Sequence, residues 1–78
     1  MTTATVRSWL KTKPERDDYL DPMASDFIDD MRGDAEMIAR FTKGLSAVQD
    51  YLYMVGACDG ARHGAEEAWH AYRQWSQQ

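Results

Sequence analysis

Two short motifs in this sequence have the residue types and spacing of metal sites. The D-D-x-x-D pattern that holds magnesium in isoprenyl-transferring enzymes occurs at Asp17-Asp18-Tyr19-Leu20-Asp21. Those enzymes enclose a prenyl diphosphate in a large helical cavity, which a chain of 78 residues is too small to build. The sequence therefore favours a solvated loop here, ending in an aspartate that caps the next helix.

The second motif places four potential ligands at His63, Glu66, Glu67 and His70, and its Glu67-x-x-His70 part resembles the inward-facing pair of di-iron bundles. On a helical wheel these side chains lie opposite an apolar stripe, so we expect them to face water. The two histidines stand about 10 Å apart along a helix axis, too far for one metal ion. We therefore predict a solvated helix face with an Arg62–Glu66 ion pair, and no metal or other cofactor.

The nucleophilic side chains lack the partners that catalysis requires. Cys58 has no second cysteine in the chain and no histidine partner nearby in sequence, so we expect it to be a small buried filler. None of Ser8, Ser25 and Ser46 stands in a nucleophile elbow. We therefore predict that the protein has no catalytic residues and is not an enzyme.

Negative charge is concentrated in one segment. Residues 15–36 hold nine carboxylates against two arginines, a net charge of −7, whereas the whole chain carries −4. This balance argues against direct binding to nucleic acid and favours a protein partner with a basic surface. The candidate acidic interaction face consists of Asp17, Asp18, Asp26, Asp29 and Asp30. The last three occupy the water-facing arc of a predicted helix, so simple solvation is the competing interpretation, and their spacing does not fit a calcium loop.

Proline and glycine divide the N-terminal half into short helices. A first helix has an apolar face of Val6, Trp9 and Leu10 and is stopped by Pro14. Asp21-Pro22 is a strong start signal for a second helix over about 22–32, which Gly33 ends. Asp34 can cap a third helix, which Gly44 closes and whose apolar residues are Met37, Ile38 and Phe41.

The C-terminal half continues this pattern. Ser46-x-x-Gln49 has the form of a capping box for a fourth helix with an apolar face of Val48, Tyr51, Leu52 and Val55. A tight corner at 57–59 precedes a last helix that runs to about Trp75, with a stripe of Ala61, Ala65, Ala68, Trp69, Tyr72 and Trp75. The sequence thus predicts an all-α fold, a compact bundle of four to five short helices in a single domain covering 1–78.

The aromatic residues are more numerous than so small a core can enclose. Tyr53 and Trp75 are therefore predicted to be exposed, as a candidate aromatic surface of the kind preferred at protein–protein contacts. The competing interpretation is that these rings cover the ends of the core.

Several motifs together resemble the YozE-like group of small bacterial and phage domains. They are Ser8-Trp9-Leu10, Arg16-Asp17-Asp18, Ala24-x-Asp26-x-x-Asp29, Tyr51-Leu52-x-x-x-Gly56-Ala57-Cys58 and Ala68-Trp69-x-x-Tyr72. The resemblance covers most of the chain, although Asp21-Pro22-Met23 stands where the group has a Gly-Asp-Leu entry to the helix, and residues 33–45 match none of its motifs. It implies a sterile-alpha-motif-like helical fold and no established activity, because a fold does not carry a function with it.

The remaining composition favours a reducing cytoplasm. The chain has a single cysteine and no asparagine that could carry a glycan, and its longest apolar run is far shorter than the roughly 20 residues that span a bilayer. The function we expect is that of a small acidic cytoplasmic protein-interaction module. The alternative is an acidic decoy, encoded by a phage or mobile element, that imitates a phosphate row and blocks a host nucleic-acid-binding or defence complex. Such an interaction module presents its surface either to a partner or to copies of itself, as a homo-oligomer.

Overall fold

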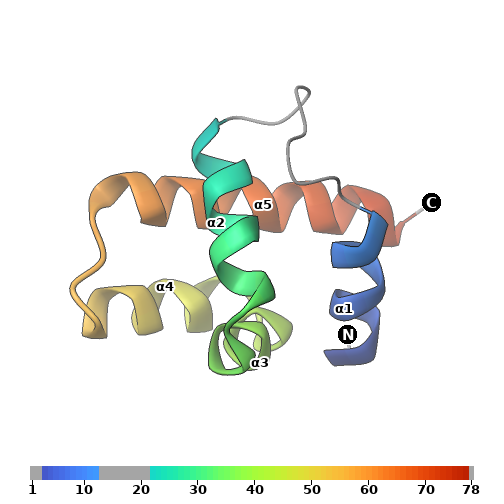
Figure 1. Cartoon of the computed structure of the whole chain (residues 1–78), viewed down its shortest axis with the longest axis horizontal. Helices are drawn as coiled ribbons and strands as arrows, with labels where there is room; N and C mark the ends of the chain where they lie inside the picture. The colour runs from blue at the N-terminus through green and yellow to red at the C-terminus, as the bar shows by residue number, and fades with distance from the viewer. Residues whose placement is uncertain (1–2, 13–21, 78) are drawn as a thin grey trace.

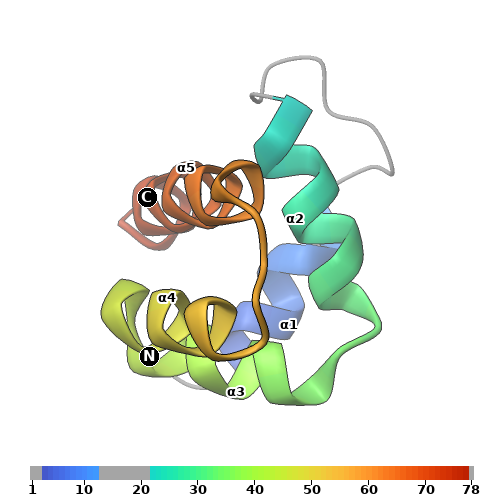
Figure 2. The same ribbon diagram turned by 90° about the vertical axis from the view of Figure 1, so that its left-hand side faces the viewer.

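The computed structural model describes residues 3–12 and 22–77, and every regular element in these two ranges is an α-helix. The helices are α1 (Thr3–Thr12), α2 (Pro22–Arg32), α3 (Ala35–Lys43), α4 (Leu45–Met54) and α5 (Asp59–Ser76). The long α5 runs across the molecule with α2 crossing it and α1 near its C-terminal part (Figure 1). Seen from the side, α5 lies above α4, with α2 and α1 to their right and α3 along the bottom (Figure 2). The predicted all-α bundle is confirmed.

The first two helices follow the local sequence signals. α1 ends at Thr12, whose hydroxyl donates a hydrogen bond to the Trp9 carbonyl at 2.7 Å. α2 begins at Pro22, because the fixed φ of proline and its missing N–H suit the first helical position, and it ends before Gly33. Pro14 and Asp21, the predicted stop and N-cap, lie outside the described residues.

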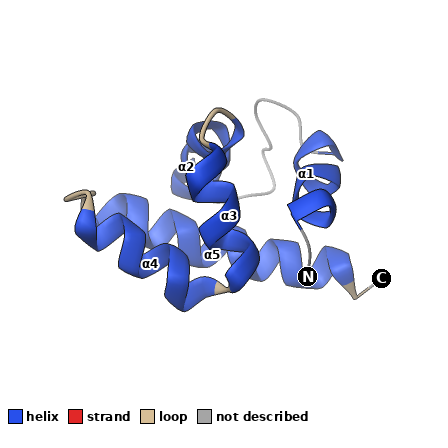
Figure 3. Ribbon diagram, turned by 90° about the horizontal axis from the view of Figure 1, so that it is seen from below, coloured by secondary structure: helices blue, strands red, loops and turns tan. Residues whose placement is uncertain are grey.

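α3 is bounded by the residues that the sequence predicted. The Asp34 side chain accepts a hydrogen bond from the Met37 N–H at 3.1 Å, which satisfies one of the free donors of the first turn. Gly44 has a φ of 132°, a conformation that favours glycine, and its N–H donates to the Phe41 carbonyl at 3.1 Å. The chain can therefore leave α3 and enter α4 at a single residue, so that α3 packs against α1, α2 and α4 (Figure 3).

The predicted capping box at the start of α4 is wrong. The helix begins at Leu45 with Gly44 as its N-cap and has no side-chain cap, so Ser46 already lies inside the helix. Gln49 does not fold back on the helix start, because its Nε2 donates to the Arg62 carbonyl of α5 at 2.8 Å. The glutamine thus joins α4 to α5.

The core is centred on three rings. Trp9 is stacked on Phe41 with ring centroids 5.9 Å apart, and Tyr72 meets both rings edge-on at 5.3 and 5.6 Å. Of the predicted α5 stripe, Ala65, Ala68 and Tyr72 are buried, while Trp69 and Trp75 are partly buried against the core. Val55 was predicted on the apolar face of α4 but is 59% exposed, because α4 ends at Met54 and Val55 is its C-cap.

The closest backbone approach joins α5 to α2. Gly64 is buried in α5, and a Cβ there would overlap the backbone carbonyl of Met23. Because glycine has no side chain, α5 can lie directly against the first turn of α2. This approach places the start of α5 beside α2, where the candidate site lies.

Candidate interaction site

The predicted acidic face divides into two parts on α2. Asp29 belongs to one part, because its Oδ1 lies 3.4 Å from the Arg32 Nη1. Asp26 and Asp30, one turn apart, belong to the other and line a pocket between α2 and α5. Asp17 and Asp18 lie outside the described residues. The structure therefore brings two of the five predicted acidic residues to one hollow.

We call this hollow the α2–α5 pocket. Its volume is about 270 Å³, and its lining residues are Met23, Asp26, Phe27, Asp30, Cys58, Gly60 and Ala61. Gly60 contributes only backbone to the lining, and a Cβ there would stand at an ordinary contact distance, 3.7 Å, from both the Met23 Sδ and the Cys58 Sγ. The pocket therefore combines an apolar interior with carboxylates contributed by a single helix.

This arrangement suits a basic side chain. A lysine or arginine has an aliphatic stem that can cover apolar surface and a charged head that carboxylates bind with charge-assisted hydrogen bonds. Phe27 is buried and Met23 is 47% exposed, so both apolar and accessible surface is present. Neither Asp26 nor Asp30 forms an ion pair with a basic residue in the described part of the chain.

The prediction that Cys58 is buried is wrong. Cys58 is exposed because it is the N-cap residue of α5, with extended backbone angles, so its side chain lies at the helix end and not on the packed face. Its place beside Asp26 and Asp30 in the pocket was not predicted. The i, i+4 spacing of the two aspartates is visible in the sequence, but nothing in the sequence places the start of α5 next to them.

The predicted aromatic surface is only half present. Tyr53 is 76% exposed, as predicted, and Met54 and Val55 beside it are 71% and 59% exposed. Trp75 is partly buried against the core, with its ring centroid 6.1 Å from that of Tyr72, so its predicted exposure is wrong. The exposed apolar residues are therefore the consecutive Tyr53, Met54 and Val55 at the end of α4, which we call the α4 tip.

The histidine motif lies on the water-facing side of α5. His63, Glu66, Glu67 and His70 are all exposed. The Glu66 Oε1 lies 3.9 Å from the His70 Nε2, so the predicted Arg62–Glu66 ion pair is replaced by a weak contact one turn further along. Within the described ranges, no three histidine, cysteine or acidic side chains are grouped as metal ligands would be. The aspartate-rich motif at 17–21 lies outside these ranges.

No family model, curated protein or solved structure matches the chain. The resemblance to the YozE-like group and its sterile-alpha-motif-like fold therefore stays a prediction. In the described part of the chain, none of the helices has the length and apolar character needed to cross a membrane.

Proposed function

We propose that the protein is a small non-enzymatic protein-interaction module that holds a basic side chain of its partner in the α2–α5 pocket. The observation that carries this proposal is the pair of exposed carboxylates, Asp26 and Asp30, at an apolar hollow in which no described basic residue pairs with them. A pocket of this kind binds one basic side chain of a protein surface more readily than an extended ligand.

The exposed α4 tip extends the proposed binding surface beyond the α2–α5 pocket. Val55 precedes Cys58 by three residues, which span at most about 11 Å of extended chain, so the apolar tip and the pocket lie close together. Asp50 and Asp59 flank this region in sequence and are exposed. Apolar anchors with charged surroundings are the usual composition of a protein–protein contact, and here the charges favour a partner with lysine or arginine at its rim.

The acidic decoy has less support. A phosphate mimic needs a row of free carboxylates, and on α2 Asp29 is already paired with Arg32. Two exposed carboxylates on α2 that pair with no described basic residue suit a single basic group better than the groove of a nucleic-acid-binding protein.

The first experiment tests the pocket without its partner. N-acetyl-arginine methylamide is titrated into isotopically labelled protein and amide chemical shifts are followed, with the neutral citrulline analogue as the control ligand. We expect the arginine analogue to shift residues 23–30 and 58–61 selectively and the citrulline analogue to shift them much less. Equal shifts at every exposed carboxylate would contradict the proposal.

The second experiment tests binding of a partner captured from a lysate. The Asp26→Asn/Asp30→Asn variant is compared with Glu66→Gln/Glu67→Gln, which removes the same charge from exposed residues that do not line the pocket. We expect the aspartate variant alone to bind about tenfold or more weakly. An affinity that depends only on net charge, with equal losses in both variants and a steep fall in salt, would favour the decoy instead.

A further inference from the structure

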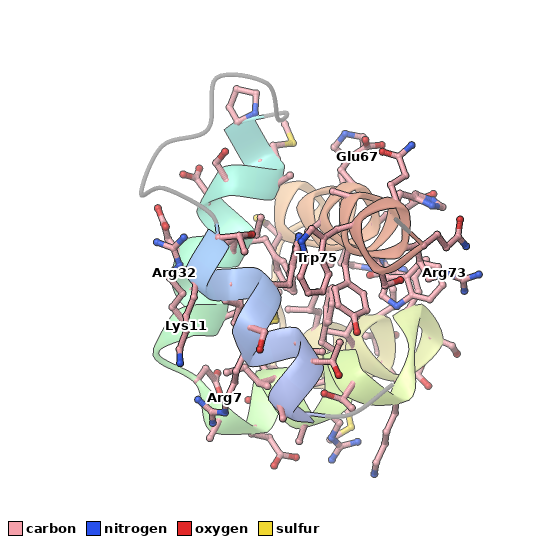
Figure 4. The ribbon with its side chains drawn as sticks, turned by 90° about the vertical axis from the view of Figure 1, so that its right-hand side faces the viewer. Arg7, Lys11, Arg32, Glu67, Arg73 and Trp75 are labelled. Atoms are coloured by element: carbon pink, nitrogen blue, oxygen red, sulfur yellow. The ribbon has the colours of Figure 1, made fainter. Side chains whose placement is uncertain are left out.

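A second hollow lies on a different surface of the bundle. It is an open groove of about 520 Å³ lined by Arg7, Leu10, Lys11, Arg32 and Ile38. Its basic residues come from α1 and from the end of α2, and their side chains lie along one edge of the molecule (Figure 4). Leu10 and Ile38 are core residues, 6% and 1% exposed, so the apolar floor is narrow, and the aliphatic stems of Arg7 and Lys11 continue it. We call this hollow the α1 groove.

Of the three basic residues in the α1 groove, Arg32 is held in place by hydrogen bonds, whereas the other two have no described ion-pair partner. Arg32 is held from two sides, since its Nη1 lies 3.4 Å from the Asp29 Oδ1 and its Nη2 lies 3.4 Å from the Leu10 carbonyl. Arg7 and Lys11 are exposed, stand one turn apart on α1, and form no ion pair with a described carboxylate. A chain with a net charge of −4 thus presents, beside this floor, two cations that have no ion pair within the described residues.

We propose that the α1 groove binds a short acidic peptide segment of a partner protein, with one large apolar side chain on Leu10 and Ile38 and carboxylates on Arg7 and Lys11. The basic residues attract the carboxylates of the peptide. The apolar floor favours a ligand that also carries an apolar side chain, so a peptide should bind better than a small inorganic anion. Arg32 is positioned in advance, so less conformational freedom is lost when it donates to a carboxylate.

A nucleic acid fits the α1 groove poorly. A phosphate backbone is a continuous row of negative charge, and its binding depends on many neutralising contacts, whereas the whole chain is acidic and Asp29 stands beside Arg32. A short peptide needs only a local positive patch. This proposal goes beyond the α2–α5 pocket, because it concerns another surface and a ligand of opposite charge.

The probe is a fluorescein-labelled peptide in which glutamate alternates with leucine, followed by fluorescence anisotropy with the full chain. We expect Arg7→Gln and Lys11→Gln to weaken binding about threefold each and about tenfold together. Both residues are exposed, so the variants should fold as the wild type does. Arg62→Gln is the matched control, because Arg62 is an exposed arginine on α5 that does not line the α1 groove.

Two altered peptides separate the two parts of the proposal. Replacing glutamate by glutamine should abolish binding, and replacing leucine by serine should weaken it strongly at unchanged charge. The proposal is overturned if the double variant binds like the wild type, or if the serine peptide binds as well as the leucine peptide. It is also overturned if a thymidine oligonucleotide displaces the labelled peptide completely. The same holds if sedimentation shows that the Arg7 and Lys11 substitutions weaken binding only by dissociating a dimer of the chain.

Discussion

Gly64 sets the distance between α2 and α5, and so the shape of the α2–α5 pocket. In Gly64→Ala the new Cβ would overlap the Met23 carbonyl and stand 3.3 Å from the Ala24 nitrogen. Both obstacles are backbone atoms that cannot rotate away, so the helices must separate. Overpacking against backbone atoms costs about 3 kcal/mol, the upper end of the usual range, and the helix propensity of alanine offsets about 1 kcal/mol of that cost. We expect a net loss of about 2 kcal/mol, which lowers the Tm of a domain this size by about 8–16 °C.

Gly60→Ala is the matched control in the same helix. Its Cβ would meet only the Met23 Sδ and the Cys58 Sγ at 3.7 Å, an ordinary contact distance. It should therefore keep the propensity gain and raise the Tm by a few degrees. Thermal unfolding followed by circular dichroism measures both variants. A Gly64→Ala protein that melts at or above the wild-type temperature would show that the helices do not approach as described.

Four further variants test the core, the α3 cap and the histidine motif. The Tyr72 hydroxyl is buried without a described hydrogen-bond partner. Tyr72→Phe should therefore be neutral or stabilise the fold by about 1 kcal/mol in urea unfolding. A clear loss of stability would show that the hydroxyl is hydrogen-bonded in the folded protein. Burial also raises the pKa of Tyr72 above 10.0, so the folded state keeps this proton after the unfolded chain has lost it. The free energy of unfolding should therefore fall as the pH rises above about 10, and this fall should be smaller in Tyr72→Phe. Asp34→Ala should cost about 1 kcal/mol in the same assay through loss of the α3 cap, and an unchanged stability would mean that the cap is not formed in solution. Trp69→Ala should cost about 2 kcal/mol or more because the ring packs against the core, whereas His63→Ala with His70→Ala should change stability by less than about 0.5 kcal/mol. Equal losses would mean that α5 is rotated from the orientation described.

Signals carried by neighbouring residues were sufficient to predict most of the fold. Pro22 and Gly33 bound α2, and Asp34 and Gly44 bound α3, because each acts on the backbone of its own turn. The capping box failed because Gly44 ends one helix and starts the next, which moves Ser46 inside α4. Apolar spacing predicted the core helices well, but it gave the wrong exposure for Val55, which follows the end of α4, where the periodic face no longer meets a neighbour.

The candidate sites were only partly predictable. The sequence placed Asp26 and Asp30 on one helix arc, but Cys58 reaches them only through the packing of α5 on α2. The α1 groove gave no signal at all, because Lys11 and Arg32 are 21 positions apart and are brought together by the bundle. Ion pairs were not predictable for the same reason, because Asp29 is taken out of the acidic face only by the basic side chain that the packed helix places beside it.

The most direct test of the proposed function is the association rate between the protein and its captured partner at low and high salt, with Asp26→Asn/Asp30→Asn and Glu66→Gln/Glu67→Gln measured side by side. The α2–α5 pocket predicts slower association and weaker binding for the aspartate variant only, with part of the affinity loss persisting in high salt because salt screens a basic group within a pocket less than one on an open surface. Identical behaviour of the two variants at both salt concentrations would contradict the proposal that this pocket is the binding site.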